Sequence, residues 1–138
     1  MTSPRTPRPA SVESSRRLSL LRSAIRRMAR QIVEAFDPDR IVLFGSHAYG
    51  LPTSESDVDI LVVMPTTNPV GQACRIRLGV EHPFPLDLLV RPQEELDARL
   101  RLGDSFWRDV LSRGKVLYEK ADRRMGTKSR GRLRVRKR

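Results

Sequence analysis

The sequence predicts an α/β protein in which a small β-sheet is flanked by helices, and three observations lead to this prediction. A long segment near the start of the chain repeats apolar residues at helical spacing. Three short apolar runs follow it, each with the length and composition of a strand buried between two layers. Proline, glycine and acidic residues mark the beginnings and ends of further helices between and after these runs.

The first predicted element is a helix from about Ser14 to Phe36. Residues 1–13 are rich in proline, serine, threonine and arginine, and we expect them to form a disordered arm. Because the residue before a proline avoids the helical region, Asp37 followed by Pro38 ends the helix. Arginines lie opposite an apolar stripe, where we expect solvent or a partner surface. The stripe comprises Leu18, Leu21, Ile25, Met28, Ala29, Ile32, Val33 and Phe36, and the arginines are Arg16, Arg26, Arg27 and Arg30.

Three predicted strands cover residues 41–44, 57–64 and 86–90. They are mostly apolar, which is typical of strands that are covered on both faces. A weakly helical segment over residues 70–78 separates the second strand from the third, and Gly79 is placed to end it.

Two further helices and an edge strand complete the predicted fold. Pro92 suits a first helical position, and acidic residues follow in the first turn, so we expect a helix from there to about Leu102. Asp104 is expected to cap a second helix that Gly114 ends. Residues 115–118 are predicted to form a fourth strand, at an edge of the sheet.

Charge is distributed unevenly along the 138 residues, which carry 27 Lys and Arg against 16 Asp and Glu. Residues 1–36 have a net charge of +6, residues 37–119 of −4 and residues 120–138 of +9. The last segment has very few apolar residues, and its like charges repel each other, so we expect a disordered basic tail. One folded domain, residues 14–119, is therefore predicted between the arm and the tail.

Membrane and secreted proteins do not fit this composition. The longest apolar run, residues 60–64, is far shorter than the roughly 20 residues needed to cross a bilayer. No apolar segment follows the first methionine as it does in a secretory signal. Cys74 is the only cysteine, so it has no partner for an internal disulfide, and we expect it to pack as a small apolar side chain. We therefore expect a cytoplasmic protein with no membrane association.

Three aspartates carry the chemistry that the sequence predicts. Asp57 and Asp59 are two residues apart on a predicted strand, so both carboxylates point to the same face. Asp87 lies in the middle of another apolar strand, where an unpartnered acid is costly to bury. Carboxylates held close together repel each other unless a cation lies between them, and hard oxygen ligands suit Mg²⁺ or Mn²⁺. If the two strands are neighbours, the sequence predicts a metal site able to act on a phosphoryl group.

Gly45 and Ser46 provide a candidate phosphate site at the end of the first strand. Glycine lets the backbone amides approach a ligand closely, and serine adds a hydroxyl donor. Each of these signals is weak alone, because Asp-x-Asp also caps turns and Asp87 could face water at a sheet edge. Their order, each on or after a predicted strand, favours a functional site.

The spacing of Gly45-Ser46 and Asp57-Val58-Asp59 resembles the signature of the DNA polymerase β-like nucleotidyltransferase superfamily. The flanking strands look like those of its small, MNT-type members, and the resemblance covers about residues 25–119. It implies a mixed sheet flanked by helices, a metal held by Asp57, Asp59 and Asp87, and triphosphate over Gly45-Ser46.

The same resemblance implies a reaction and a partner. A nucleoside monophosphate, AMP from ATP in the leading interpretation, would move to an acceptor hydroxyl that Asp87 helps to activate. Small members of the family are often paired with a HEPN-type toxin, as its antitoxin, and can adenylylate that partner protein.

The sequence departs from the family pattern at one position and leaves two alternatives open. Many relatives carry an arginine between the serine and the second glycine, where this chain has His47-Ala48-Tyr49. We expect the compensating charge to come from the metals or from elsewhere, with Arg91 and Arg108 as the candidates. The first alternative is a catalytically weak antitoxin that neutralises its toxin by contact alone. The second is a nucleic-acid-associated protein that uses its basic tails.

Overall fold

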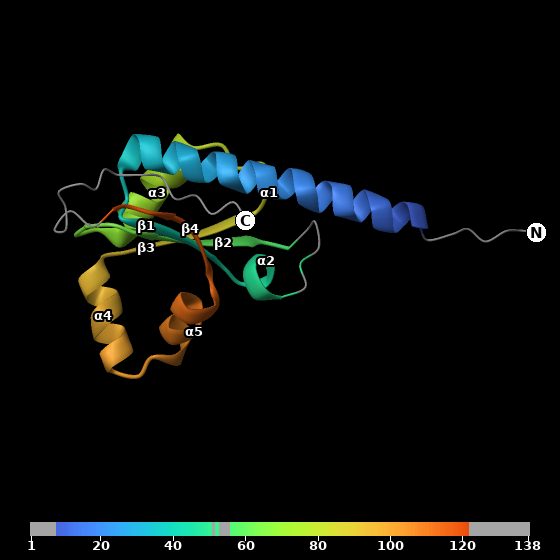
Figure 1. Ribbon diagram of the computed structural model, residues 1–138. Coiled ribbons are helices and arrows are strands. Elements are labelled where there is room, and N and C mark those ends of the chain that lie inside the picture. The colour runs from blue at the N-terminus through green and yellow to red at the C-terminus, as the bar shows by residue number, and fades with distance from the viewer. Residues whose placement is uncertain (1–7, 51, 53–55, 122–138) are drawn as a thin grey trace, which may run out of the picture.

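The computed structural model describes residues 8–50, 52 and 56–121, and side chains from residue 15 onward. A four-stranded mixed sheet lies between two pairs of helices (Figure 1). In chain order, its strands are β1 (Arg40–Phe44), β2 (Val58–Val63), β3 (Leu86–Arg91) and β4 (Lys115–Glu119). The helices are α1 (Arg8–Phe36), α2 (Ser46–Tyr49), α3 (Pro69–Gly79), α4 (Gln93–Arg101) and α5 (Ser105–Arg113). The α/β fold class that the sequence predicts is confirmed.

The order of strands in the sheet is β3-β2-β1-β4. The strand β1 pairs antiparallel with both β2 and β4, while β2 and β3 run parallel. The parallel pair is connected through α3, as a parallel connection requires a crossover. β4 lies at an edge, as predicted, and β3 lies at the other edge.

Two apolar cores, one on each face of the sheet, hold the layers together. The larger core joins α1 and α3 to one face, and the predicted stripe of α1 supplies Ile25, Met28 and Ile32 to it. The smaller core joins α4 and α5 to the other face through Leu96 and Trp107. Alternate residues of β1, β2 and β3 serve the two cores, which explains why these strands are almost wholly apolar.

The boundaries of the first and last elements differ from those predicted. The helix α1 begins at Arg8, so residues 8–13, which were expected to belong to the disordered arm, are helical. Lys120 was assigned to the tail, yet its backbone N–H donates to the Asp39 carbonyl at 2.9 Å and its Nζ lies 3.1 Å from Asp37 Oδ1. The rest of the predicted arm, residues 1–7, and the tail from residue 122 lie outside the described residues.

The interior elements agree closely with the predicted ones. Asp104 caps α5 by accepting hydrogen bonds from the N–H groups of Phe106 at 3.0 Å and Trp107 at 3.3 Å. One expectation was wrong, because Cys74 is exposed on α3 rather than packed in the core. None of the helices, over the residues described, is long and apolar enough to span a membrane.

Candidate active site

The parallel pairing of β2 with β3 places Asp59 directly beside Asp87. Asp57 immediately precedes β2 and points to the same face as Asp59 and Leu61. Leu61 belongs to the smaller core, so the carboxylates share the face of the sheet that α4 and α5 cover. Asp57 and Asp87 are exposed, whereas Asp59 is half-buried.

Asp59 is the aspartate whose pKa is shifted by burial and by the other charged groups of the site. Burial raises the pKa of its carboxyl above the ordinary value of 3.8, and the charges of Asp87 and Asp57 raise it further. The charge of His47 acts in the opposite direction, and a side-chain hydrogen bond with Asp87 adds to the increase. The three aspartates that the sequence predicted to converge therefore influence one another in the folded chain.

Gly45 packs directly against the Asp59 side chain. Phe44, the last residue of β1, is paired with Asp59, so the turn at Gly45 starts next to this carboxylate. A Cβ atom at position 45 would lie 2.0 Å from Asp59 Oδ2, and the φ of Gly45 is +78°. Both the space and the backbone conformation therefore require glycine at this position.

Ser46 starts the four-residue helix α2, which follows the glycine turn. The Gly45 carbonyl accepts hydrogen bonds from the N–H groups of Ala48 and Tyr49, at 2.9 and 3.0 Å. The Nε2 atom of His47 lies 3.1 Å from the Ser56 carbonyl oxygen, across the loop that leads to β2. The structure thus brings Gly45, Ser46 and Asp59 to the same end of the β1–β2 pair.

The aspartates are of the right chemical type to bind a divalent metal, but they do not form a complete metal site by themselves. Carboxylate oxygens are hard ligands of the type that Mg²⁺ and Mn²⁺ take, and Asp59 and Asp87 are held as a pair. Within the described residues, no group of three or more His, Cys, Asp or Glu side chains is arranged to hold a metal ion. The pair would thus provide protein ligands, and further oxygens would have to come from a substrate or from water.

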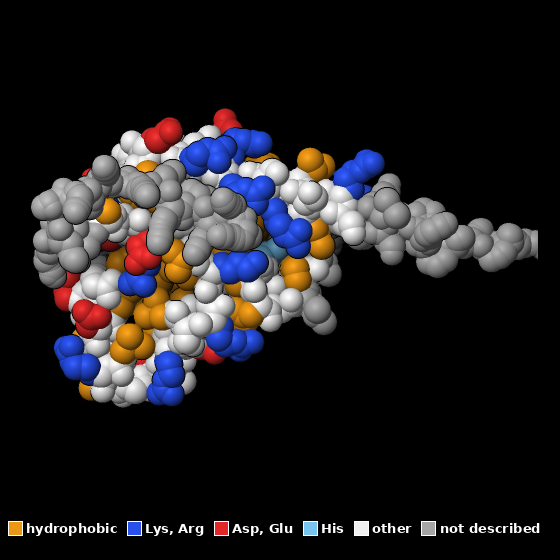
Figure 2. Space-filling model, viewed as in Figure 1, with side chains coloured by type: hydrophobic (Ala, Val, Ile, Leu, Met, Phe, Trp, Pro, Cys, Tyr) orange, Lys and Arg blue, Asp and Glu red, His pale blue; other side chains and the backbone are white. Residues whose placement is uncertain are grey.

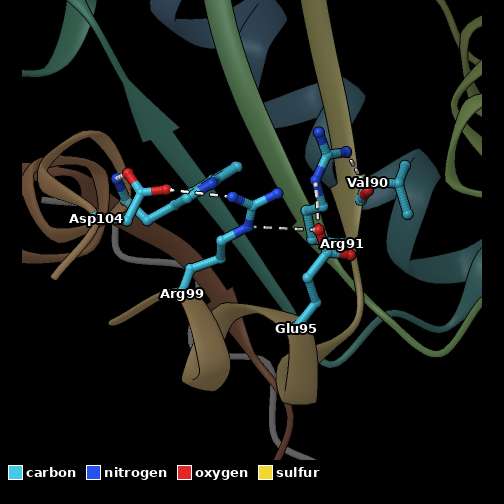
Figure 3. Close-up of polar contacts among 6 residues, drawn as sticks. Val90, Arg91, Glu95, Arg99 and Asp104 are labelled. Carbon is cyan, nitrogen blue, oxygen red and sulfur yellow. Dashed lines mark hydrogen bonds and ion pairs between the residues drawn. The ribbon is translucent and has the colours of Figure 1, made fainter. Parts of the chain in front are cut away.

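Arg91 does not provide the free positive charge that the sequence analysis expected near the phosphate site. Its Nε lies 3.6 Å from Glu95 Oε2, and its Nη1 donates to the Val90 carbonyl at 2.7 Å (Figure 3). Its guanidinium also stacks over Trp107. Glu95 also contacts Arg99, which lies 3.6 Å from Asp104. This network joins β3, α4 and the start of α5. No contact in the described structure ties Arg108 to α2.

Arg113 is a cation beside α2 that the sequence analysis missed. Its guanidinium carbon lies 4.2 Å from the centroid of the Tyr49 ring, and its Nη1 lies 3.5 Å from Asp109 Oδ1. Tyr49 packs on the carboxylate face of the sheet, so Arg113 is next to the turn that begins at Gly45. The sequence holds no signal for this contact, because Arg113 and Tyr49 are brought together only by the packing of α5.

Comparison with known proteins identifies the family to which this chain belongs. A family model described as a nucleotidyltransferase domain matches residues 25–117, which include Gly45, Ser46 and the three aspartates. A protein of Methanocaldococcus jannaschii, provisionally named a protein adenylyltransferase, is 34% identical over 79 residues, or 57% of this chain and 77% of that relative. A crystal structure from Sulfolobus solfataricus, of a protein provisionally named a nucleotidyltransferase, has a TM-score of 0.56. It is 17% identical and the alignment covers 75% of this chain and 85% of that one, so it shows a shared fold. The chain therefore belongs to the nucleotidyltransferase domain family and has its polymerase β-like fold.

Proposed function

We propose that this chain is a metal-dependent nucleotidyltransferase that moves AMP from ATP to a hydroxyl group of a partner protein. The observation that carries the proposal is the in-register pair of Asp59 and Asp87, packed against Gly45 at the start of the turn to Ser46. Two carboxylates beside a glycine-serine turn suit a reaction at a phosphoryl centre.

In the proposed reaction the acceptor hydroxyl oxygen attacks the α-phosphorus of ATP in line with the leaving group. A new oxygen–phosphorus ester bond forms, the bond between the α-phosphorus and the bridging oxygen breaks, and pyrophosphate leaves with that electron pair. Asp87 is exposed and takes the hydroxyl proton, while Asp59 and Asp57 complete the acidic face. Gly45 and Ser46 lie next to the triphosphate.

A divalent cation, Mg²⁺ or Mn²⁺, would be held by Asp59 and Asp87, with Asp57 as the third acid. When bound, it would supply positive charge between the carboxylates and the phosphate oxygens. Because Asp59 and Asp87 are the only closely paired members of the group, we expect the metal to bind weakly alone and more tightly with nucleotide.

Arg113 would supply part of the positive charge that relatives take from an arginine within the glycine-serine turn. It lies on Tyr49, three residues after Ser46. The metal would supply the rest.

A protein acceptor is favoured over a small molecule by two considerations. The relative from Methanocaldococcus jannaschii carries a provisional name that specifies a protein substrate. Among the described residues, the carboxylate face of the sheet is also covered by two nine-residue helices, α4 and α5, and by Tyr49 of α2, which leave little chain to enclose a small acceptor. A partner protein would present its own Tyr, Ser or Thr hydroxyl. From the resemblance stated above, we propose a HEPN-type toxin as that partner, which would make this chain its antitoxin.

The test is incubation of the purified chain with labelled ATP, Mg²⁺ and the protein encoded beside its gene. We expect an AMP adduct on the partner by mass spectrometry, absent with Asp59→Asn and with Asp87→Asn. Glu81→Gln removes an exposed acid beside α1, where the Glu81 N–H donates to Gln31 Oε1; it is the matched control and should keep full activity.

Three results would contradict parts of the proposal. Tight binding of the partner with no adduct would favour an antitoxin that acts by contact alone. Efficient modification of a small alcohol or of an RNA end, with the partner untouched, would overturn the protein acceptor. Unchanged Mg-ATP affinity in the Asp57→Asn, Asp59→Asn double variant, measured by calorimetry, would overturn the metal assignment.

A further inference from the structure

A cavity of about 520 Å³ lies between α1 and the start of β4. Its apolar lining includes Ile25 of α1, Leu43 of β1 and Leu117 of β4. This volume lies within the range of about 300–1,000 Å³ that is typical of sites for small organic ligands. The proposed catalytic chemistry does not use this cavity.

The cavity and the carboxylates are on opposite faces of the sheet. Ile25, Leu43 and Leu117 all belong to the larger core, beneath α1. Asp59 points to the other face, together with Leu61 and the smaller core. His47, at the end of the sheet, lines the cavity. Its charge also lowers the pKa of Asp59, so His47 lies between the two sites.

The cavity is lined by three cationic side chains, Arg22, Arg26 and Lys115. Across residues 15–50, 52 and 56–121, no hydrogen bond or ion pair involves any of the three. Figure 2 shows several Lys and Arg side chains gathered along α1. Like charges that converge without an acidic partner repel each other, and an anionic ligand would relieve this repulsion.

We propose that this cavity is a second ligand site, which binds an organic phosphate of the nucleotide class. The phosphate groups would lie among Arg22, Arg26 and Lys115, because guanidinium and ammonium groups bind phosphate oxygens by charge-assisted hydrogen bonds. The flat apolar part of the ligand would lie on Ile25, Leu43 and Leu117. The phosphate-bearing ligand is either a free nucleotide or the end of a nucleic acid chain, which share this chemistry.

The experiment is calorimetric titration of the full chain with ADP in the presence of EDTA, which removes metal from the carboxylates. We expect the affinity to fall at least tenfold in the Arg22→Gln, Arg26→Gln, Lys115→Gln variant. The Asp59→Asn, Asp87→Asn variant should keep or improve it, because the carboxylates repel phosphate. The matched control is Arg17→Gln, Arg27→Gln, Arg30→Gln, which removes the same charge from exposed positions of α1 outside the cavity and should leave affinity within about twofold.

A second measurement locates the bound nucleotide directly and does not depend on a variant that folds. Photo-crosslinking with 8-azido-ADP should label peptides that contain residues 22–26 or 114–117, and ADP should compete. A 5′-phosphorylated single-stranded RNA that binds more tightly than ADP, with the same loss in the cavity variant, would identify nucleic acid as the source. Weaker binding of the RNA would identify a free nucleotide.

Four results would overturn the second site. In the titration, they are a failure of ADP to bind at millimolar concentration and an equal loss of ADP affinity in the cavity and control variants. In the crosslinking experiment, they are labelling confined to β2 and β3, and displacement of 8-azido-ADP by inorganic phosphate as effectively as by ADP. Catalysis is measured in none of these experiments, so the proposed transferase activity and the second site can fail separately.

Discussion

At the scale of single residues, Gly45 determines where the Asp59 carboxylate can lie. In the Gly45→Ala variant, the new Cβ would collide with Asp59 Oδ2, and the backbone would hold alanine at a φ of 78° and a ψ of −158°. This combination is essentially confined to glycine, so we expect the variant to lose about 1–3 kcal/mol of stability from the backbone strain alone and more from the displaced carboxylate. Denaturant unfolding measures the first effect, and nucleotide binding in Mg²⁺ measures the second.

Gly103 provides the matched control for this prediction. Its φ is +79°, almost the same as that of Gly45, but a Cβ there would meet no atom within 4 Å. Gly103→Ala should therefore show the strain of a positive φ without the clash, and nucleotide binding should be unchanged. If Gly45→Ala were no less stable than Gly103→Ala and bound nucleotide normally, the contact with Asp59 would have no functional role.

The pKa of Asp59 predicts how stability depends on pH. Burial, and then the charges of Asp87 and Asp57, raise this pKa above 3.8, so the folded protein favours the protonated carboxyl. The stability that Asp59 contributes is therefore complete below pH 3.8 and is lost as pH rises through its raised folded pKa. Asp59→Asn is neutral at every pH, so in EDTA it should melt above the parent at pH 7.

The comparison across pH separates this effect from a general change of charge. The advantage of Asp59→Asn over the parent should shrink as pH falls through the raised folded pKa of Asp59, and it should be gone below pH 3.8, where the parent carboxyl is protonated in both states. Glu81→Gln removes an exposed acid and should show no such trend. A variant that melts below the parent at pH 7 would show that the carboxylate is stabilised in the folded chain.

The sequence could identify the aspartates but not their positive partners. Asp57, Asp59 and Asp87 are recognisable because acids within apolar strands are rare and alternate residues share a face. Arg113 lies 64 positions after Tyr49, and only the packing of α5 brings the two side chains together. Arg26 was expected on the solvent side of the first helix, yet it is half-buried and lines the cavity, because β4 packs beside that part of α1.

At the scale of elements, α2 and α5 meet through Arg113 and Tyr49, and this contact can be tested. We expect Arg113→Gln to lower the rate of the proposed AMP transfer about tenfold, or about 1.4 kcal/mol in barrier height. The stability lost should be smaller, about 0.5–1 kcal/mol, because the cation–π contact is exposed. Single-turnover kinetics and thermal melting measure the two effects.

Arg108→Gln is the control for this prediction, because Arg108 is an exposed arginine of the same helix with no side-chain contact in the described structure. It should keep both rate and melting temperature. If the two variants slowed transfer equally, the loss would reflect general charge rather than the position of Arg113 beside α2.

Element boundaries were predictable where capping chemistry marks them. Asp104 and Gly114 bound α5 as expected, because a side-chain cap and a glycine stop act locally. The start of α1 was misplaced because prolines suggested an irregular arm, yet Pro9 lies in the first helical turn, where its missing N–H breaks no helical bond. Whether β2 and β3 are neighbours stayed open, since hydrophobic pattern alone does not set the order of strands. The family resemblance implied only a mixed sheet, and the parallel pairing of β2 with β3 comes from the structure.

At the scale of the whole molecule, the basic charge lies mainly outside the described fold. Nine basic residues and one acidic residue follow Ala121, so a chain that ends there has its net charge lowered from +11 to +3. Within the described residues, the last side-chain contacts belong to Lys120, whose side chain is only 19% exposed and lies 3.1 Å from Asp37 Oδ1 and 3.9 Å from Asp39 Oδ1. The described fold is therefore complete once Lys120 is included.

We predict that a chain ending at Ala121 melts within about 2 °C of the full chain, since few apolar residues are removed. A chain ending at Glu119 also loses the Lys120 ion pairs and its hydrogen bond to the Asp39 carbonyl, about 1 kcal/mol, which corresponds to several degrees in a domain of this size.

Affinity for nucleic acid should instead depend on the basic segment after Ala121 and not on Lys120. The full chain should bind single-stranded RNA with a steep dependence on salt, and both shortened chains should bind it weakly and alike, because released counterions dominate such binding. A large loss of stability on ending at Ala121 would mean that the basic segment packs on the acidic domain, and RNA binding that survives its removal would have to come from the cations of α1 and β4.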